Sequence, residues 1–474
     1  MKLLIKSAVF FAFFLCSIRT SYRATAQVPR DNFSNEEASW YEVTNYDVSC
    51  EISPVRRSLA VTALLTLRAL HNDVTSVRVF LHKEFTVKSA SSGKQALKFT
   101  PLGQSRDKLF FSPTGTPLDI ELPQRLNKGD RTGIQLAYGG EISSVINEVN
   151  LVSEPLTELA LYSSWFPLVH EGAHFTYSLK ITLPVGFICI TDGEPLQKTD
   201  DGIKTVYIFR RDQPGMDIPI VVSNSLKVKR LEVPGFRAEM YYRNLEDALA
   251  GEFIQKFIDG YRLLEQKVGG AVGTGRLVFV VSPRSGWGYS RVPLFVVPEV
   301  YMLKVLSEAD GKMESMHGCL HEMGHFWWRL ASSATSDDWI NESLAEFFSL
   351  YACEQFFGRE PVNRVLGRYV DRVKRLKDAK PIVETLRTDK NGDVLYYEKG
   401  ALIWEMLRQK LGDQKLFDAL RRYYSAHRSG PPATTQNLIE AFSAETKGDT
   451  NAFFQEFLKT NSLTNLRIGL GVGK

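Results

Sequence analysis

The chain has 474 residues, 44% of them hydrophobic and 24% charged, which excludes a disordered or fibrous protein and is too long for one ordinary domain. Of the 58 basic residues, four (Lys2, Lys6, Arg19 and Arg23) lie in residues 1–26, so the remaining chain carries 54 basic and 54 acidic residues. A formally neutral chain offers no electrostatic reason to bind nucleic acid, and we expect none as a partner.

Residues 1–26 are typical of a secretory signal. Two lysines precede an apolar run from Ala8 to Ile18, and the small residues Ala24 and Ala26 follow with the spacing of a signal-peptidase site. The apolar run is shorter than the ~20 residues that span a bilayer. We predict a cleaved signal peptide, an exported (secreted or periplasmic) chain, and no integral membrane span in the mature protein. An uncleaved N-terminal anchor is the alternative.

The segment from Trp40 to about Lys227 has the pattern of strands. Apolar residues alternate or run continuously there, with many β-branched and aromatic side chains, and turn clusters such as SSGK, SPTGTP and NKGD separate them. Strands are expected at residues 41–53, 59–70, 76–90, 131–140 and 175–190. We predict an all-β sandwich domain over residues 27–228.

The C-terminal half has the pattern of helices. We expect a helix at 244–269, strands at 276–283 and 293–303, and an almost entirely helical chain beyond Met313. The helices expected there are the segment around HEMGH and residues 338–358, 396–412, 414–427 and 434–445. These patterns predict a mostly helical α+β domain over residues 229–474.

Four cysteines follow the predicted signal: Cys50, Cys189, Cys319 and Cys353. Their spacings fit no zinc finger, and four cysteines in so long a chain do not make a disulfide scaffold. Whether Cys50 and Cys189 pair is left open by the sequence.

Two segments, residues 170–174 and 321–325, have the form His-Glu-x-x-His. On an α-helix, histidines four residues apart can direct their rings at one metal ion, and the glutamate beside the first reaches the metal's water. Pro167 precedes the first segment, Gly172 lies inside it and strand-like residues follow, so we expect a loop there without metal. The second segment lies in an apolar helical stripe. We predict a zinc site there, with Glu322 next to the metal's water.

A catalytic zinc ion needs three protein ligands and one open position. His321 and His325 supply two, and Glu342, in the first turn of the next predicted helix, supplies the third. Glu346, one turn later on the same face, is predicted to hold a ligand imidazole, with a role as third ligand as the alternative. His317, one turn before His321, is expected to pack beside the site, because a fourth ligand would close it.

Three segments together resemble the aminopeptidase N family of gluzincin zinc metallopeptidases. HEMGHFWW, WINESLAEFF and YEKGALIWEML match, in order, that family's HExxH, W-L-N-E and Y-E-K-G segments, and WFPLVHEGAHFTYSLKITLPVG resembles part of its N-terminal β-domain. The resemblance covers roughly residues 41–458 and implies a β-sandwich followed by a thermolysin-like catalytic domain. It implies these site residues: His321, His325 and Glu342 as zinc ligands, Glu322 as general base, and Tyr397 as the phenol that stabilises the oxyanion.

The chain departs from that family in four respects. The sixteen residues 326–341 before the ligand glutamate are fewer than the family's usual spacing. In place of the family's Gly-x-Met-Glu-Asn, whose glutamate binds the substrate's amine, stands GWGYSRVP, in which Arg291 would repel an ammonium. We predict that Arg291 binds a substrate carboxylate or carbonyl, with a structural surface charge as the alternative. No counterpart of the family's amine-binding residue appears in the N-terminal domain, and the helical C-terminal domain is missing, which suggests an open cleft.

These features predict an exported zinc metallopeptidase that hydrolyses peptide bonds of a peptide or protein substrate. Because the amine-binding residues are missing, an endopeptidase, or an exopeptidase that acts at a different end, fits almost as well as an aminopeptidase. The alternative from another class is a catalytically silent peptide-binding protein that keeps the fold and the zinc. A hydrolase acting on something other than a peptide is a third possibility.

Overall fold

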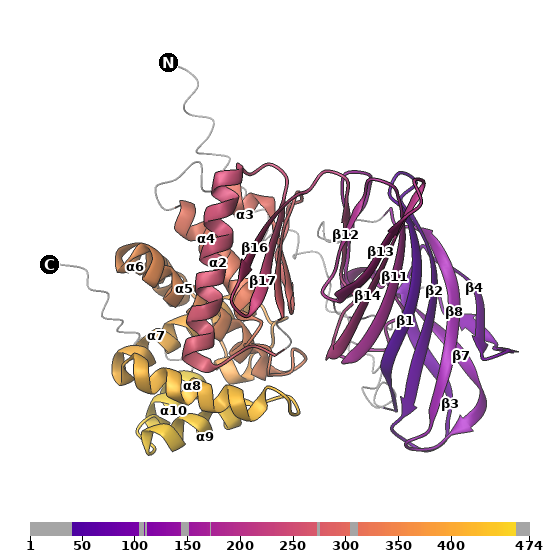
Figure 1. Ribbon diagram of the computed structural model, residues 1–474. Coiled ribbons are helices and arrows are strands. Elements are labelled where there is room, and N and C mark those ends of the chain that lie inside the picture. The colour runs from indigo at the N-terminus through magenta and orange to yellow at the C-terminus, as the bar shows by residue number, and fades with distance from the viewer. Residues whose placement is uncertain are drawn as a thin grey trace.

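The computed structural model describes residues 40–103, 109, 111–143, 151–170, 172–272, 275–303 and 311–460. The predicted signal peptide lies outside these residues, so that assignment stays a prediction. Strands make up the N-terminal half and most helices lie in the C-terminal half (Figure 1). This arrangement confirms the predicted fold class, an all-β domain followed by a mostly helical α+β domain.

Three sheets make up the N-terminal half. An eight-stranded sheet has the order β13-β14-β11-β1-β2-β8-β4-β5, a three-stranded sheet the order β3-β7-β6, and a four-stranded sheet the order β12-β15-β10-β9. The strands are β1 (Tyr41–Ser53), β2 (Ser58–Ala69), β3 (Val74–His82), β4 (Thr86–Ser92), β5 (Gln95–Ala96), β6 (Phe99–Pro101), β7 (Gly115–Leu126), β8 (Arg131–Glu141), β9 (Leu151–Val152), β10 (Thr157–Leu159), β11 (Phe175–Pro184), β12 (Ile188–Ile190), β13 (Glu194–Asp200), β14 (Lys204–Gly215) and β15 (Ile220–Ser223).

The sheets pack face to face because each strand has one apolar side. In β1, Val48 and Ile52 are buried while Ser49 and Glu51 between them are exposed, the alternation expected of a half-buried strand. The buried sides of the eight-stranded and three-stranded sheets contribute to one hydrophobic cluster. Cys50 also lies in this cluster; it and Cys189 are both buried free thiols.

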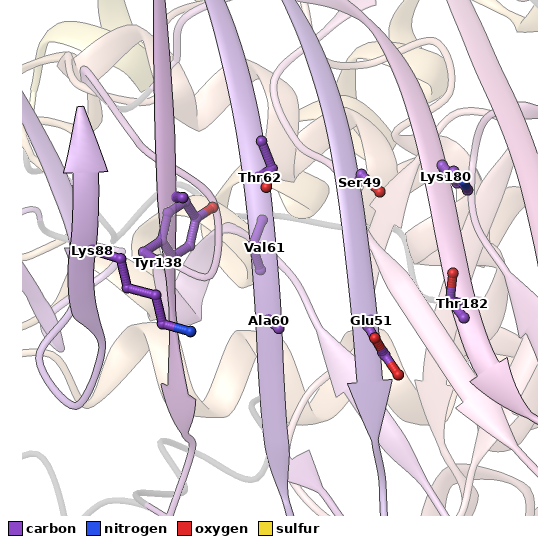
Figure 2. Close-up of a pocket in the computed structure, with 10 residues that line it drawn as sticks. Ser49, Glu51, Ala60, Val61, Thr62, Lys88, Tyr138, Lys180 and Thr182 are labelled. Atoms are coloured by element: carbon purple, nitrogen blue, oxygen red, sulfur yellow. The ribbon is translucent and has the colours of Figure 1, made fainter. Parts of the chain in front are cut away.

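The outer face of the eight-stranded sheet carries a hollow of about 260 Å³ (Figure 2). Its lining is mostly polar and includes Ser49, Glu51, Thr62, Lys88 and Lys180. Neither HExxH segment contributes to it. The hollow is therefore separate from the predicted zinc site.

A five-stranded sheet opens the C-terminal half, in the order β16-β17-β18-β20-β19. Its strands are β16 (Lys227–Val233), β17 (Phe236–Tyr242), β18 (Arg276–Ser282), β19 (Tyr289–Arg291) and β20 (Leu294–Pro298). The strand predicted over 293–303 is wrong in its second half, which forms the short helix α3 (Glu299–Leu303). Pro298 lacks the N–H that would extend the ladder, and Glu299 suits a helix N-terminus. The sheet begins at Lys227, and the domain boundary between residues 228 and 229 stays a prediction.

Helices cover this sheet and form the rest of the described chain (Figure 1). The α-helices are α2 (Asp247–Val268), α4 (Gly311–Gly324), α5 (Trp339–Phe357), α6 (Arg359–Lys374), α7 (Gly400–Leu411), α8 (Asp413–His427), α9 (Thr435–Thr446) and α10 (Asn451–Lys459). Short 3-10 turns lie at η3 (Leu161–Ser163), η5 (Ser336–Asp338) and η6 (Ile382–Glu384), and η7 (Val394–Lys399) is a π-helix. No helix among the described residues is long and apolar enough to cross a bilayer.

Helix α5 is the centre of the C-terminal half. Every residue from Trp339 to Cys353 is buried, so the helix is enclosed on all sides. Helix α4 packs closely against it, because a Cβ added at Gly324 would lie only 3.0 Å from the Cα atom of Ala345. This close approach brings the second HExxH segment, on α4, beside the first turn of α5.

Candidate metal centre

The structure brings His321, His325 and Glu342 together. One ligand atom from each lies within 4.8 Å of the others. The Glu342 Oε2 atom is 3.4 Å from His321 Nε2 and 3.5 Å from His325 Nε2. All three side chains are buried. The shortened loop between the helices thus still delivers the glutamate to the two histidines.

The donor set fits a divalent metal ion such as zinc. Two imidazoles and one carboxylate form a common zinc ligand set, and a single metal ion accepts bonds from all three. Glu342 Oε2 is buried and has no hydrogen-bond partner. A buried carboxylate oxygen without a partner costs free energy, and a cation between the three atoms would remove that cost.

Each ligand is held by a second group. His321 Nδ1 lies 2.8 Å from a Glu346 carboxylate oxygen, and His325 Nδ1 lies 3.1 Å from the Trp328 carbonyl oxygen. Such partners orient the rings and leave each Nε2 free for a metal ion. Glu346 therefore lies behind His321, where we predicted it, and not in the ligand cluster. His317 Nε2 lies 3.0 Å from the other Glu346 oxygen, which places His317 in the supporting layer as well.

Two partners of this supporting layer were not predicted from the sequence. Arg387 pairs with the second oxygen of Glu342 and with Asp338, and the Tyr369 hydroxyl donates to Glu346. Each contact joins residues far apart in the chain. Arg387 stands in TLRTDK and Tyr369 in GRYVDR, and neither segment has a spacing that marks it as part of a site.

The electrostatics of the cluster favour a bound cation. Burial alone would lower the pKa of His321, but the carboxylates of Glu342 and Glu346 outweigh it and raise the pKa to about 10. Burial alone would raise the pKa of Glu342, yet the charge of Arg387 and the nearby His325 hold it well below its usual range. An ionised carboxylate facing two imidazoles attracts a proton or a metal ion that replaces the proton.

Glu322 and Tyr397 lie at the edge of this cluster. A Cβ at Gly288 would lie 2.7 Å from Glu322 Oε1, so the glycine leaves room for the carboxylate. The Tyr397 ring stacks on the His321 ring with centroids 5.2 Å apart. Burial and then the charge of Glu342 raise the pKa of Tyr397 well above its usual range, so its hydroxyl stays protonated. Both groups thus lie next to the candidate metal position.

The first HExxH segment is not a helix. Its described residues form bends and a turn before β11, and Gly172 has a φ of +86°. The His174 Nδ1 atom lies 2.9 Å from the Gly172 carbonyl oxygen. The expectation of a loop is confirmed, and among the described residues the group able to hold a metal ion lies in the second segment.

Arg291 is buried at the junction of the two halves. Its Nε lies 2.7 Å from Asp217 Oδ2, and its Nη1 donates to the Ser290 carbonyl oxygen. The alternative of a surface charge is wrong because the side chain is only 6% exposed. Tyr289, in the motif where the family has its amine-binding glutamate, is buried as well. The substrate-binding role of Arg291 stays a prediction, and its pairing with Asp217 leaves its charge largely neutralised.

Comparison with known proteins indicates the family of the C-terminal domain. Residues 294–457, which include α4, α5 and η7, match the model described as Peptidase family M1 domain. They form an M1 domain. Because this family is one of zinc metallopeptidases, the predicted aminopeptidase N-like gluzincin type and the zinc cofactor are confirmed for this domain.

Two curated proteins are similar to part of this chain. The Aminopeptidase N of Haemophilus influenzae is 29% identical over 143 residues, and that of Escherichia coli is 26% identical over 143 residues. Each match covers 28% of this chain and 16% of the relative. The match thus spans about a sixth of the length of these aminopeptidases.

Solved structures share the fold of this chain over most of its length. The M1 zinc metallopeptidase of Deinococcus radiodurans aligns with a TM-score of 0.71 at 17% identity, covering 92% of this chain and 96% of that one. A mutant of the Deinococcus enzyme bound to a Tyr-Ser-Ala substrate aligns with a TM-score of 0.70 and 17% identity, covering 90% and 96%. The chain thus shares its overall fold with the Deinococcus M1 zinc metallopeptidase.

We expect His325→Ala to lose the zinc ion, because two ligands hold a catalytic zinc ion poorly. Metal analysis of the purified variant should show zinc well below one ion per chain. His174→Ala, which removes the corresponding histidine of the first HExxH segment, is the matched control and should keep its zinc. Loss of zinc from the His174 variant with full retention in the His325 variant would mean that the metal binds the first segment.

Proposed function

We propose that this protein is an exported zinc-dependent peptidase that hydrolyses peptide bonds. The observation that carries the proposal is the buried cluster of His321, His325 and Glu342, with Glu322 beside it in an M1 domain. The export part rests on residues 1–26 alone. Identification of Gln27 as the first residue of the purified native protein would support export by a cleaved signal peptide, and an intact N-terminus would contradict that cleavage.

In the proposed reaction, each side chain of the site has a different role. A zinc ion bound by the three ligands would polarise the scissile carbonyl and acidify a water molecule. Glu322 would take a proton from the attacking water and pass it to the leaving amine nitrogen. The Tyr397 hydroxyl, which is protonated, would donate a hydrogen bond to the oxygen on which negative charge develops. Glu346 and the Trp328 carbonyl would keep the two imidazoles oriented throughout.

The mode of substrate recognition differs in our proposal from that of an aminopeptidase. An aminopeptidase needs a free carboxylate to bind the substrate's ammonium group. At the junction of the two halves, Glu158 is fully buried with Arg284 and Ser282, and Asp217 is paired with Arg291. These carboxylates are already neutralised by arginines. We therefore infer that the enzyme does not depend on the N-terminal amine of its substrate.

A mixed peptide library read by mass spectrometry tests both proposals. We expect cleavage of longer peptides and poor turnover of chromogenic derivatives of single free-amine amino acids, and the cleavage positions would show which end, if any, is recognised. Efficient release from the single-residue substrates that is abolished by N-acetylation would contradict the proposed recognition. Absence of all cleavage by the zinc-loaded protein would favour a silent peptide-binding protein.

A further inference from the structure

Arg329 lies beside the metal centre at the junction of the two halves. It comes five residues after the end of α4, and the carbonyl of Trp328 just before it is the partner of His325 Nδ1 at 3.1 Å. The backbone at Arg329 is therefore fixed next to a zinc ligand. Its Nη1 lies 3.6 Å from the Met216 sulfur of the N-terminal half, so the side chain reaches across the junction. The residue is partly exposed.

Arg329 differs from three other arginines at this junction, each of which pairs with a buried carboxylate. Three buried acidic residues each have an arginine partner, in the pairs Asp192–Arg211, Asp217–Arg291 and Glu158–Arg284. Across the described part of the chain, no carboxylate lies within salt-bridge distance of Arg329, whose one recorded polar partner is the weak acceptor Met216. The junction next to the zinc site therefore carries a surplus positive charge.

The surroundings of Arg329 make this charge costly without a ligand. Burial lowers the pKa of Arg329 to about 10 and the charge of Arg291 acts in the same direction, while Tyr162, Glu322 and Glu342 oppose them. The guanidinium is thus still charged at neutral pH and lies within electrostatic reach of Glu322. A partly buried guanidinium whose protein partner is only a thioether gains from binding an anion.

The geometry points to Arg329 as the residue that binds a carboxylate group of the peptide substrate next to the scissile bond. This inference rests on the proposed peptidase function and names the substrate class: peptides with a carboxylate close to the cleavage point. That carboxylate is either the C-terminus of a short peptide or an Asp or Glu side chain, and both offer the two oxygens that a guanidinium binds. The same charge would repel a substrate ammonium group.

Binding to the zinc-loaded Glu322→Gln variant measures this preference without turnover. Titration calorimetry would compare Ala-Ala-Ala with a free C-terminus, the same peptide as its C-terminal amide, and Ala-Glu-Ala amide. We expect one or both carboxylate-bearing peptides to bind roughly ten- to a hundredfold more tightly than the neutral amide, as a charge-assisted hydrogen bond would provide. Tighter binding of Ala-Ala-Ala with a free C-terminus would identify the C-terminal carboxylate as the ligand of Arg329. Tighter binding of Ala-Glu-Ala amide would identify a side-chain carboxylate.

Adding Arg329→Gln to that variant should remove the preference while the zinc content is unchanged, and Arg329→Lys should retain part of it. Arg422→Gln, a substitution of an exposed arginine on α8, is the matched control and should keep the full preference. Equal affinity for all three peptides, no measurable binding of any, or a preference that survives Arg329→Gln would overturn the inference. If the wild-type protein cleaves nothing but the Arg329-dependent preference is present, the peptidase proposal fails instead.

Discussion

Glu322→Gln should remove nearly all peptidase activity while the protein keeps its zinc ion. Glu322 is not one of the three clustered ligands, and it lies against Gly288 where glutamine has the same size and shape. The amide cannot accept the proton of the attacking water, and loss of a general base typically costs about 10²–10⁴ in rate. The measurements are kcat on a peptide found in the library and zinc per chain.

Glu314→Gln is the matched control for this prediction. Glu314 lies on the same helix, α4, and its carboxylate pairs with Arg368 at 2.8 Å on the outer side. An exposed pair of this kind contributes little to stability, so the variant should keep both zinc and kcat. A Glu322→Gln protein with wild-type kcat would contradict the assigned base. Zinc loss from that variant would show that Glu322 is itself needed to hold the metal.

Tyr397→Phe should lower kcat with little change in KM. Its ring stacks on His321, and phenylalanine retains that contact, so zinc content and fold should be unchanged. What is lost is one hydrogen-bond donor to the developing oxyanion, a change that costs on the order of 10²–10³ in rate, or about 2.7–4 kcal/mol. Steady-state kinetics on the same peptide give both constants.

Tyr396→Phe is the control for Tyr397→Phe. The Tyr396 side chain is fully buried, and its hydroxyl donates to the Thr385 carbonyl oxygen at 2.6 Å, away from the ligand cluster. Its removal should cost about 1 kcal/mol of the free energy of unfolding and leave kcat nearly unchanged. An inactive Tyr396 variant beside a normal Tyr397 variant would show that the two roles are exchanged. If neither variant loses activity while Glu322→Gln is inactive, another group stabilises the oxyanion.

The two tyrosines also show where sequence patterns fail. An α-helix was expected over 396–412, but residues Val394–Lys399 form a π-helix that continues as α7. A π-helix has a wider turn, and it often occurs at functional sites because it changes the direction of a side chain. Apolar periodicity cannot distinguish the two helices. The orientation of Tyr397 toward His321 therefore had to come from the structure.

The sequence by itself determined most of the strands and helices and which of the two HExxH segments is helical. These depend on short-range rules: alternation in a strand, four-residue spacing on a helix, and the interruption of a helix by Pro167 and Gly172. Glu342 was predicted for the same reason, because it stands in a recognisable segment at the start of a helix.

Only the tertiary structure decided which arginine near the site pairs with a carboxylate. Arg291 and Arg329 are both arginines near the site, and nothing in the sequence around them says which has a partner. The fold places Asp217 of the N-terminal half 2.7 Å from Arg291, while Arg329 meets the sulfur of the neighbouring Met216. Such pairing depends on packing between segments more than seventy residues apart, as the 74-residue separation of Arg291 and Asp217 shows, and local periodicity carries no information about it.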